Sequence, residues 1–226
     1  MLLVRLARLE DLPEVGLADA PAWMDEAERR RSAQGSATAR AQFIAGRALM
    51  RLALERATGF PPEAWTVSAE PGRAPRVRGP ADVHVSLSHR LGWVAAAVSN
   101  GPVGVDVECP RARRSLPEER AGLMLAPEEL SAWIALRPAA RESALLERWT
   151  AKEAWFKAAP GQDAAWDFRR VIASACESAR ANVRVWLAPP LHVAVCSHHP
   201  GALAAAQCEA LPGGHEASSF WHVALA

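Results

Sequence analysis

Two carboxylates lie two residues apart in the run Gly104–Glu108, which reads GVDVE. Because valines alternate with the acids, the run predicts a strand whose successive side chains point to opposite faces. Asp106 and Glu108 would then project from one face, where like charges repel unless a cation lies between them. Mg²⁺ prefers carboxylate oxygens, water and substrate phosphates as ligands, so the pair is a candidate magnesium site. Taken alone, the pair also fits a solvated strand edge.

A second group of charged residues lies in the run Trp149–Lys157, which reads WTAKEAWFK. On a helix, residues four apart share a face, so Trp149, Glu153 and Lys157 would line one side, with Lys152 beside them. A carboxylate with two lysines nearby has the chemistry to complete a metal site and to bind phosphate oxygens. A surface helix with a Glu153–Lys157 ion pair, contributing about 0.2–0.5 kcal/mol, fits the same pattern.

Polar residues also gather where an alternating strand ends. The run Val83–Leu87 alternates apolar and polar residues, and Ser88, His89 and Arg90 follow it directly. A hydroxyl, an imidazole and a guanidinium at such a junction can surround a phosphate. A structural turn explains the same residues equally well.

Arginines recur through the first helical region of the chain. Arg47 and Arg51 are four residues apart and would share a helix face that can hold a phosphomonoester by bidentate contacts. A solvated helix face is the alternative interpretation. The arginines of this series are Arg29, Arg30, Arg31, Arg40, Arg47 and Arg51.

The elements that must position these residues are predicted in the order helix, strands, helix, strands. The first helix ends at Thr58, because Gly59 and the prolines that follow cannot prolong it. The predicted helices are 23–58 and 117–159, the second interrupted near Pro138, and the predicted strands are 2–6, 83–88, 93–98, 103–107, 181–186, 191–196 and 221–225.

The repeated order of elements indicates two similar α+β lobes, each within ordinary domain size. We expect the N-terminal lobe at 1–110, with the arginine-rich helix and the Ser-His strand. The C-terminal lobe would span 111–226 and carry the helix that contains Trp149–Lys157.

Composition narrows the class of protein. The 226 residues carry a formal net charge of +1, so no overall field favours nucleic acid or membrane as a partner. No segment approaches the ~20 apolar residues of a membrane-spanning helix, and residues 1–10 lack the apolar run of a secretory signal. The cysteines show no CxxC spacing, which disfavours a zinc site or a disulfide framework and favours a reducing, cytoplasmic setting. They are Cys109, Cys176, Cys196 and Cys208.

Read together and in order, these motifs resemble those of the Sfp-type 4′-phosphopantetheinyl transferases. The family signatures are Ser-His at a strand end, Gly-Val-Asp-Val-Glu, and Trp-x-x-Lys-Glu-Ala-x-x-Lys, which match Ser88-His89, Gly104–Glu108 and Trp149–Lys157. The resemblance implies Mg²⁺-dependent transfer of the 4′-phosphopantetheine arm of coenzyme A to a serine of an acyl, peptidyl or aryl carrier protein, with release of adenosine 3′,5′-bisphosphate. It also implies two α+β lobes related by a pseudo-twofold axis with the active site between them, which a monomer can build.

The resemblance assigns roles to individual residues. Asp106, Glu108 and Glu153 would hold Mg²⁺, and Glu153, Lys157 and Asp106 would be the catalytic residues. Glu153, or a metal-bound water that it orients, would take the proton of the attacking hydroxyl. The residues assigned to coenzyme A are Arg40, Arg47, Arg73, Ser88, His89, Lys152 and Lys157.

Some positions depart from the family pattern or leave alternatives open. Arg90 follows His89 where the family has a small or hydroxyl residue, and it would either support or crowd the phosphate site. Ala74 interrupts the Gly-Lys/Arg-Pro element that brings Arg73 near the adenine. The segment 111–136 is either a docking surface for an acidic carrier protein or a core-facing helix. The alternative functions are a degenerate member that binds coenzyme A or a carrier protein without catalysis, and a different magnesium-dependent nucleotide enzyme.

Overall fold

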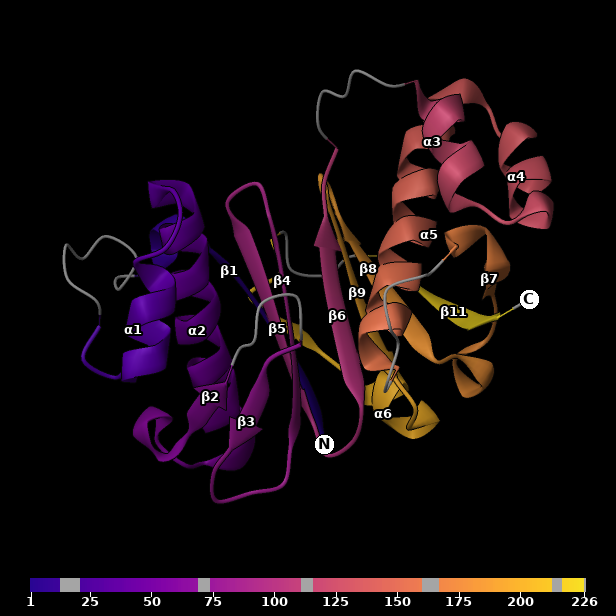
Figure 1. The fold of residues 1–226 in the computed structure, drawn as a ribbon. Helices are drawn as coiled ribbons and strands as arrows, with labels where there is room; N and C mark the ends of the chain where they lie inside the picture. The colour runs from indigo at the N-terminus through magenta and orange to yellow at the C-terminus, as the bar shows by residue number, and fades with distance from the viewer. Residues whose placement is uncertain (13–20, 69–73, 111–115, 160–166, 213–216, 226) are drawn as a thin grey trace.

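The computed structural model of the chain describes residues 1–12, 21–68, 74–110, 116–159, 167–212 and 217–225. Within them, two main β-sheets pack against each other, and a long helix covers the outer face of each sheet (Figure 1). The layers therefore run helix, sheet, sheet, helix. This arrangement confirms the predicted α+β class.

The first sheet has the strand order β10-β1-β5-β4 and packs against helix α2. Its neighbouring strands are antiparallel, except that β10 pairs with β1 in parallel. Strand β5 is apolar on both faces, because Val94 and Val98 pack toward α2 whereas Ala95 lies in the core between the sheets. The elements of this layer are β1 (Leu2–Arg8), α2 (Ala37–Thr58), β4 (His84–Arg90), β5 (Trp93–Ser99) and β10 (Cys208–Glu209).

The second sheet has the strand order β6-β9-β8-β11-β7 and packs against helix α5. A Cβ atom added to Gly104 would lie 1.9 Å from the carbonyl oxygen of Ala154, so only glycine lets the α5 backbone approach β6 this closely. The elements of this layer are β6 (Val103–Glu108), α5 (Pro138–Ala158), β7 (Val171–Ala175), β8 (Val183–Ala188), β9 (Leu191–Ser197) and β11 (Ala217–Leu225).

Shorter elements connect and flank these layers. Four of them are helices of the α type, and a small two-stranded sheet joins β2 to β3. Short 3-10 turns occur at Leu9–Asp11, Pro62–Ala64, Phe168–Arg170 and Ser178–Arg180. The remaining elements are α1 (Glu26–Ser32), β2 (Thr66–Ser68), β3 (Arg76–Arg78), α3 (Pro117–Met124), α4 (Pro127–Ile134) and α6 (Pro200–Ala205).

Both predicted helical regions are subdivided. The region 23–58 contains α1 and α2, separated where Gly35 adopts a φ of +99° and the Ser36 hydroxyl caps α2 by accepting a hydrogen bond from the Ala39 N–H (3.2 Å). The region 117–159 contains α3, α4 and α5, and each of these helices begins at a proline. Proline fits the first turn of a helix but interrupts a longer one, which explains the divisions.

The two sheets do not divide the chain at residue 110 as predicted. Strand β6 lies in the second sheet although it precedes this boundary, and β10, from the C-terminal part, completes the first sheet. The sheets therefore exchange strands across the expected lobe boundary. The pseudo-twofold relation between the lobes stays a prediction.

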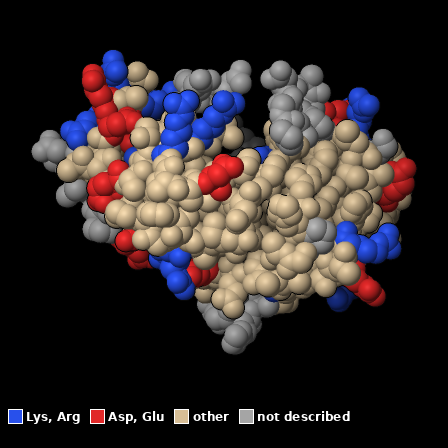
Figure 2. Space-filling view, turned by 90° about the horizontal axis from the view of Figure 1, so that it is seen from below, with Lys and Arg blue, Asp and Glu red and all other residues tan. Residues whose placement is uncertain are grey.

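The surface carries no single dominant sign of charge on the face seen from below, where acidic and basic side chains stand mainly around the margin (Figure 2). This agrees with the formal net charge of +1. In the described part of the chain, no helix is both long enough and apolar enough to cross a membrane.

Candidate active site at the junction of the sheets

Side chains of β4 connect the two sheets at their junction with β6. The hydroxyl of Ser86 accepts a hydrogen bond from the backbone N–H of Val105 (3.0 Å), and the hydroxyl of Ser88 donates to Asp106 Oδ1 (2.8 Å). These residues alternate along β4 with residues that face α2, as a strand requires. The connection leads directly to the carboxylates of the GVDVE run.

A pocket of about 330 Å³ opens at this junction, and we call it the acidic pocket. It brings together residues from three elements, β4, β6 and α5, that are far apart in the sequence. It unites Ser88, His89 and the four charged residues to which the sequence assigns metal binding or catalysis. Its lining residues are Leu87, Ser88, His89, Asp106, Glu108, Trp149, Glu153 and Lys157.

Lys157 neutralises only part of the negative charge in the acidic pocket. Its Nζ donates to Asp106 Oδ1 (2.7 Å) and to the Val105 carbonyl (3.2 Å). Burial, and then the charges of Asp106 and Glu108, raise the pKa of Glu153 to about 7, although Lys157 opposes the shift. The acids of this pocket therefore carry more negative charge than the lysine offsets.

The donor chemistry of the acidic pocket fits a divalent cation. It offers carboxylates from Asp106, Glu108 and Glu153, and Asp106 Oδ2 is buried without a hydrogen-bond partner. In their present positions, however, no three acidic, histidine or cysteine side chains of the described residues converge closely enough to hold a metal ion. One reason is that cations of the chain itself, Lys157 and Arg90, occupy oxygens of Asp106 and Glu108. Metal binding would require these ion pairs to rearrange.

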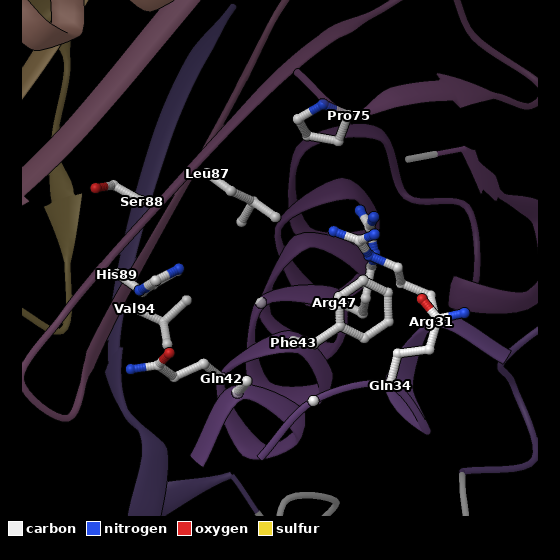
Figure 3. Close-up of a pocket in the computed structure, with 13 residues that line it drawn as sticks. Arg31, Gln34, Gln42, Phe43, Arg47, Pro75, Leu87, Ser88, His89 and Val94 are labelled. Carbon is white, nitrogen blue, oxygen red and sulfur yellow. The ribbon is translucent and has the colours of Figure 1, made fainter. Parts of the chain in front are cut away.

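A second cavity, of about 460 Å³, adjoins the acidic pocket and lies between α2 and β4 (Figure 3). We call it the arginine pocket. Leu87, Ser88 and His89 line both cavities, so the two adjoin along β4. The residues that line it are Arg31, Gln34, Gly35, Ala39, Gln42, Phe43, Gly46, Arg47, Pro75, Leu87, Ser88, His89 and Val94.

Arg47 forms a buried, cationic part of this wall. Its guanidinium lies 4.8 Å from the centre of the Phe43 ring, and the charged ends of Arg31 and Arg47 converge beside that ring (Figure 3). Burial is the main cause that lowers the pKa of Arg47, and the charge of Glu28 opposes the shift. Its Nε and Nη1 are buried without hydrogen-bond partners. Unused donors beside an aromatic ring suit a phosphorylated nucleotide.

Glu28 of α1 holds the arginines of α2, a role that the sequence analysis missed. Arg51 donates two hydrogen bonds to its carboxylate (3.0 and 2.7 Å), and Arg47 Nε lies 3.4 Å from Glu28 Oε1. The signal in the sequence is the spacing of Asp25 and Glu28, which form a capping box at the start of α1. A glutamate fixed in this way can hold two guanidinium groups at once.

His89 lies at the boundary of both pockets. Burial, followed by the nearby charge of Lys157, lowers the pKa of its imidazole below the usual value, and Asp106 opposes this shift. The imidazole is therefore neutral at pH 7 and can donate one hydrogen bond.

Lys152 is not brought to either pocket. It is fully buried, and its Nζ forms an ion pair with Glu129. It also donates to the carbonyl oxygens of Met124 (2.9 Å) and Phe168 (3.2 Å). All three ammonium donors thus have partners inside the protein, and this geometry does not support the predicted phosphate contact. The periodicity that places Glu153 on the pocket face turns its neighbour into the core.

Two further arginines that the sequence assigns to coenzyme A are not among the described residues that line either pocket. Arg40 lies in the first turn of α2 but is absent from the residues that line the two pockets. Arg73 lies outside the described residues, as do the arginines of 111–115.

Within the predicted docking segment, Leu116, Leu123 and Ile134 are 62%, 72% and 54% exposed. Trp133, in contrast, is fully buried, so this segment is partly core and partly surface.

Comparison with known proteins agrees with these motifs. Residues 102–208 match the model of the 4′-phosphopantetheinyl transferase superfamily. The chain is 27% identical over 172 residues to the 4′-phosphopantetheinyl transferase psf-1 of Bacillus pumilus, covering 70% of this chain and 72% of that protein. It is 33% identical over 78 residues to the 4′-phosphopantetheinyl transferase gsp of Aneurinibacillus migulanus, covering 34% of this chain and 31% of that protein.

Proposed function

Because this chain belongs to the 4′-phosphopantetheinyl transferase superfamily, we propose that it transfers the 4′-phosphopantetheine arm of coenzyme A to a serine of an acyl, peptidyl or aryl carrier protein. The observation that carries this proposal is that the arginine pocket and the acidic pocket adjoin and share Ser88 and His89 in their walls. One end suits a nucleotide with a phosphomonoester, and the other suits a pyrophosphate. Coenzyme A carries both groups in one molecule.

The nucleotide end of coenzyme A is assigned to the arginine pocket. Its volume of about 460 Å³ is ordinary for a small-molecule site. Phe43 and Leu87 offer apolar surface to the adenine, and Arg47 has donors for the 3′-phosphate. His89 lies where the nucleotide would pass into the acidic pocket.

Mg²⁺ is assigned to the acidic pocket, where Asp106, Glu108 and Glu153 would hold it. The support is the set of carboxylates and the unpartnered buried oxygen of Asp106. Bound there, the ion supplies positive charge that offsets the charge on phosphate oxygens. The other contributions come from residues of the chain.

The transfer needs a proton acceptor and a cation near the reacting phosphate. The carrier serine oxygen forms a new bond to the β-phosphorus of coenzyme A, and the bond to the bridging oxygen breaks with release of adenosine 3′,5′-bisphosphate. Glu153 is assigned the hydroxyl proton, either directly or through a water that it orients. Lys157 offsets negative charge on the leaving group.

The carrier protein is assigned to the surface of α3 and α4. Leu116, Leu123 and Ile134 expose apolar side chains there, which gives a docking helix something to bury. We further propose that the chain acts as a monomer, because one chain supplies both pockets. A cytoplasmic location agrees with the four free cysteines.

The test is the intact mass of an apo carrier protein incubated with the chain, coenzyme A and Mg²⁺. We expect a gain of one phosphopantetheine arm, which chelation of the metal prevents. Asp106→Ala and Glu153→Ala should abolish the gain, whereas the exposed control Glu63→Gln should keep it.

The alternative functions give different results in the same assay. Coenzyme A binding without a mass gain on any class of carrier protein would indicate a degenerate binder. Turnover of a nucleotide without a carrier protein would indicate a different magnesium-dependent enzyme. Full activity of Asp106→Ala or Glu153→Ala would contradict the assigned metal ligands.

A further inference from the structure

Arg90 is the last residue of β4, and its side chain turns toward a carboxylate of the acidic pocket. Its Nε lies 2.8 Å from Glu108 Oε2, and the two side chains are 19% and 11% exposed. An ion pair so poorly hydrated is stronger than a surface pair, because water screens it less. Arg90 stands where the family has a small or hydroxyl residue. Its guanidinium therefore forms an ion pair with Glu108, one of the proposed metal ligands.

We propose that Arg90 exchanges partners during ligand binding: it pairs with Glu108 in the metal-free protein and with a donor phosphate once a divalent cation takes Glu108. This inference rests on the proposed function. It makes Arg90 a residue that sets both metal affinity and coenzyme A affinity, in opposite directions. It also combines the two sequence-based interpretations of Arg90, because the side chain crowds the metal ligand in one state and supports the phosphate in the other.

The charges around Arg90 support this exchange. Of the carboxylates in the acidic pocket, Asp106 already has Lys157 as its cation, whereas Glu108 has Arg90. A divalent cation that takes Glu108 must displace a guanidinium, so the free energy of that ion pair opposes metal binding. The displaced guanidinium then needs an anion. Arg90 lines neither pocket itself, but Ser88, two residues earlier on the same face of β4, lines both, so an anionic ligand in either one lies on the side of the strand that carries Arg90.

The exchange predicts opposite effects of one substitution on two ligands. We expect Arg90→Ser to bind Mn²⁺, used as the probe in place of Mg²⁺, about fivefold or more tightly in the absence of coenzyme A. The same variant should bind coenzyme A about fivefold or more weakly in the presence of Mg²⁺. Electron paramagnetic resonance of free Mn²⁺ and calorimetry with coenzyme A measure these affinities without any turnover.

Two matched variants separate the exchange from other effects. Arg90→Lys keeps the cation and should stay within about twofold of the wild type for Mn²⁺, since a lysine still pairs with Glu108. Arg56→Ser removes a positive charge that is ion-paired with Glu209, on β10 at the opposite edge of the same sheet. It should change neither affinity. Thermal melting of each variant checks that the fold is kept.

Each outcome decides the proposal. Tighter Mn²⁺ binding together with weaker coenzyme A binding in Arg90→Ser supports it. Unchanged or weaker Mn²⁺ binding overturns it, and so does unchanged coenzyme A binding. If the wild type binds both ligands but Arg90→Ser behaves like it, only this inference fails. If no variant binds coenzyme A at all, the proposed function fails, and the inference fails with it.

Discussion

The two long helices, α2 and α5, each carry buried cationic side chains, two on α2 and one on α5, that pair with a glutamate from a shorter helix earlier in the chain. On α2, Arg47 and Arg51 meet Glu28 of α1. On α5, Lys152 meets Glu129 of α4. In both places the glutamate also accepts a hydrogen bond from the backbone N–H three residues before it, at the start of its own helix.

The two pairings differ in how many N–H donors of the cation remain without a hydrogen-bond partner. Lys152 has three N–H donors, and Glu129 together with two carbonyl oxygens uses all of them. Arg47 shares its glutamate with Arg51, so two buried donors of its guanidinium have no hydrogen-bond partner, and Arg47 lies in the wall of a cavity. A glutamate paired with a buried cation therefore stabilises the packing of α5. On α2 the same kind of pairing leaves donors of Arg47 available to an anion. Donor count and access to a cavity make the difference.

The largest effect is expected from breaking the closed pair on α5. Lys152→Met keeps most of the side-chain volume but leaves the Glu129 carboxylate buried without its cation. We expect the free energy of unfolding to fall by about 3–5 kcal/mol, which urea denaturation measures. Changing both residues to apolar ones should recover part of the loss. A decrease below about 1 kcal/mol would show that the pair is not a major source of stability.

A smaller effect, on binding rather than on folding, is expected on α2. Arg47→Met removes donors that face the arginine pocket, while Arg51 continues to satisfy Glu28. Coenzyme A affinity should fall about 10- to 100-fold, the range for lost hydrogen bonds to a charged group. Calorimetry with coenzyme A and with 3′-dephospho-coenzyme A measures the loss. An equal loss for both ligands would contradict the assignment of Arg47 to the 3′-phosphate.

The smallest effect should come from Glu153, which follows Lys152 on α5. The nearby charge of Lys157 opposes the rise in the pKa of Glu153 but does not cancel it. Its pKa is raised to about 7, so the folded protein binds this proton more tightly than the unfolded chain does. Stability of the metal-free protein is therefore lost as the pH rises from about 4.5 to about 7. Glu153→Gln should remove about 1 kcal/mol of this pH-dependent loss, because Glu153 is only partly buried. Parallel slopes of unfolding free energy against pH for both proteins would contradict the shift.

The acidic pocket was the part of the site most open to prediction from sequence. Period-two alternation places Asp106 and Glu108 on one face of β6, and four-residue spacing places Glu153 and Lys157 on one face of α5. Both patterns involve residues close together in the sequence, so they can be recognised without the structure. Their meeting in one pocket depends on Gly104, which lets the helix approach the strand.

Long-range pairing explains what the sequence did not predict. Lys152 faces the core because it forms an ion pair with Glu129 there and donates hydrogen bonds to two carbonyl oxygens. None of these partners is a neighbour in sequence. Arg90 meets Glu108 only because β4 and β6 end at the same junction. The short strands β7 and β10 escaped prediction because a few residues show little periodicity.

Strand β10 has a consequence for how the chain is made. Strand β1 (Leu2–Arg8) is synthesised well before its outer neighbour, which lies about 200 residues later, at residues 208 and 209. Until then one edge of the first sheet offers bare N–H and C=O groups to any passing strand, a known route to aggregation. The middle of this edge, at Val4 and Arg5, thus stays open until residues 208 and 209 have been made and pair with it.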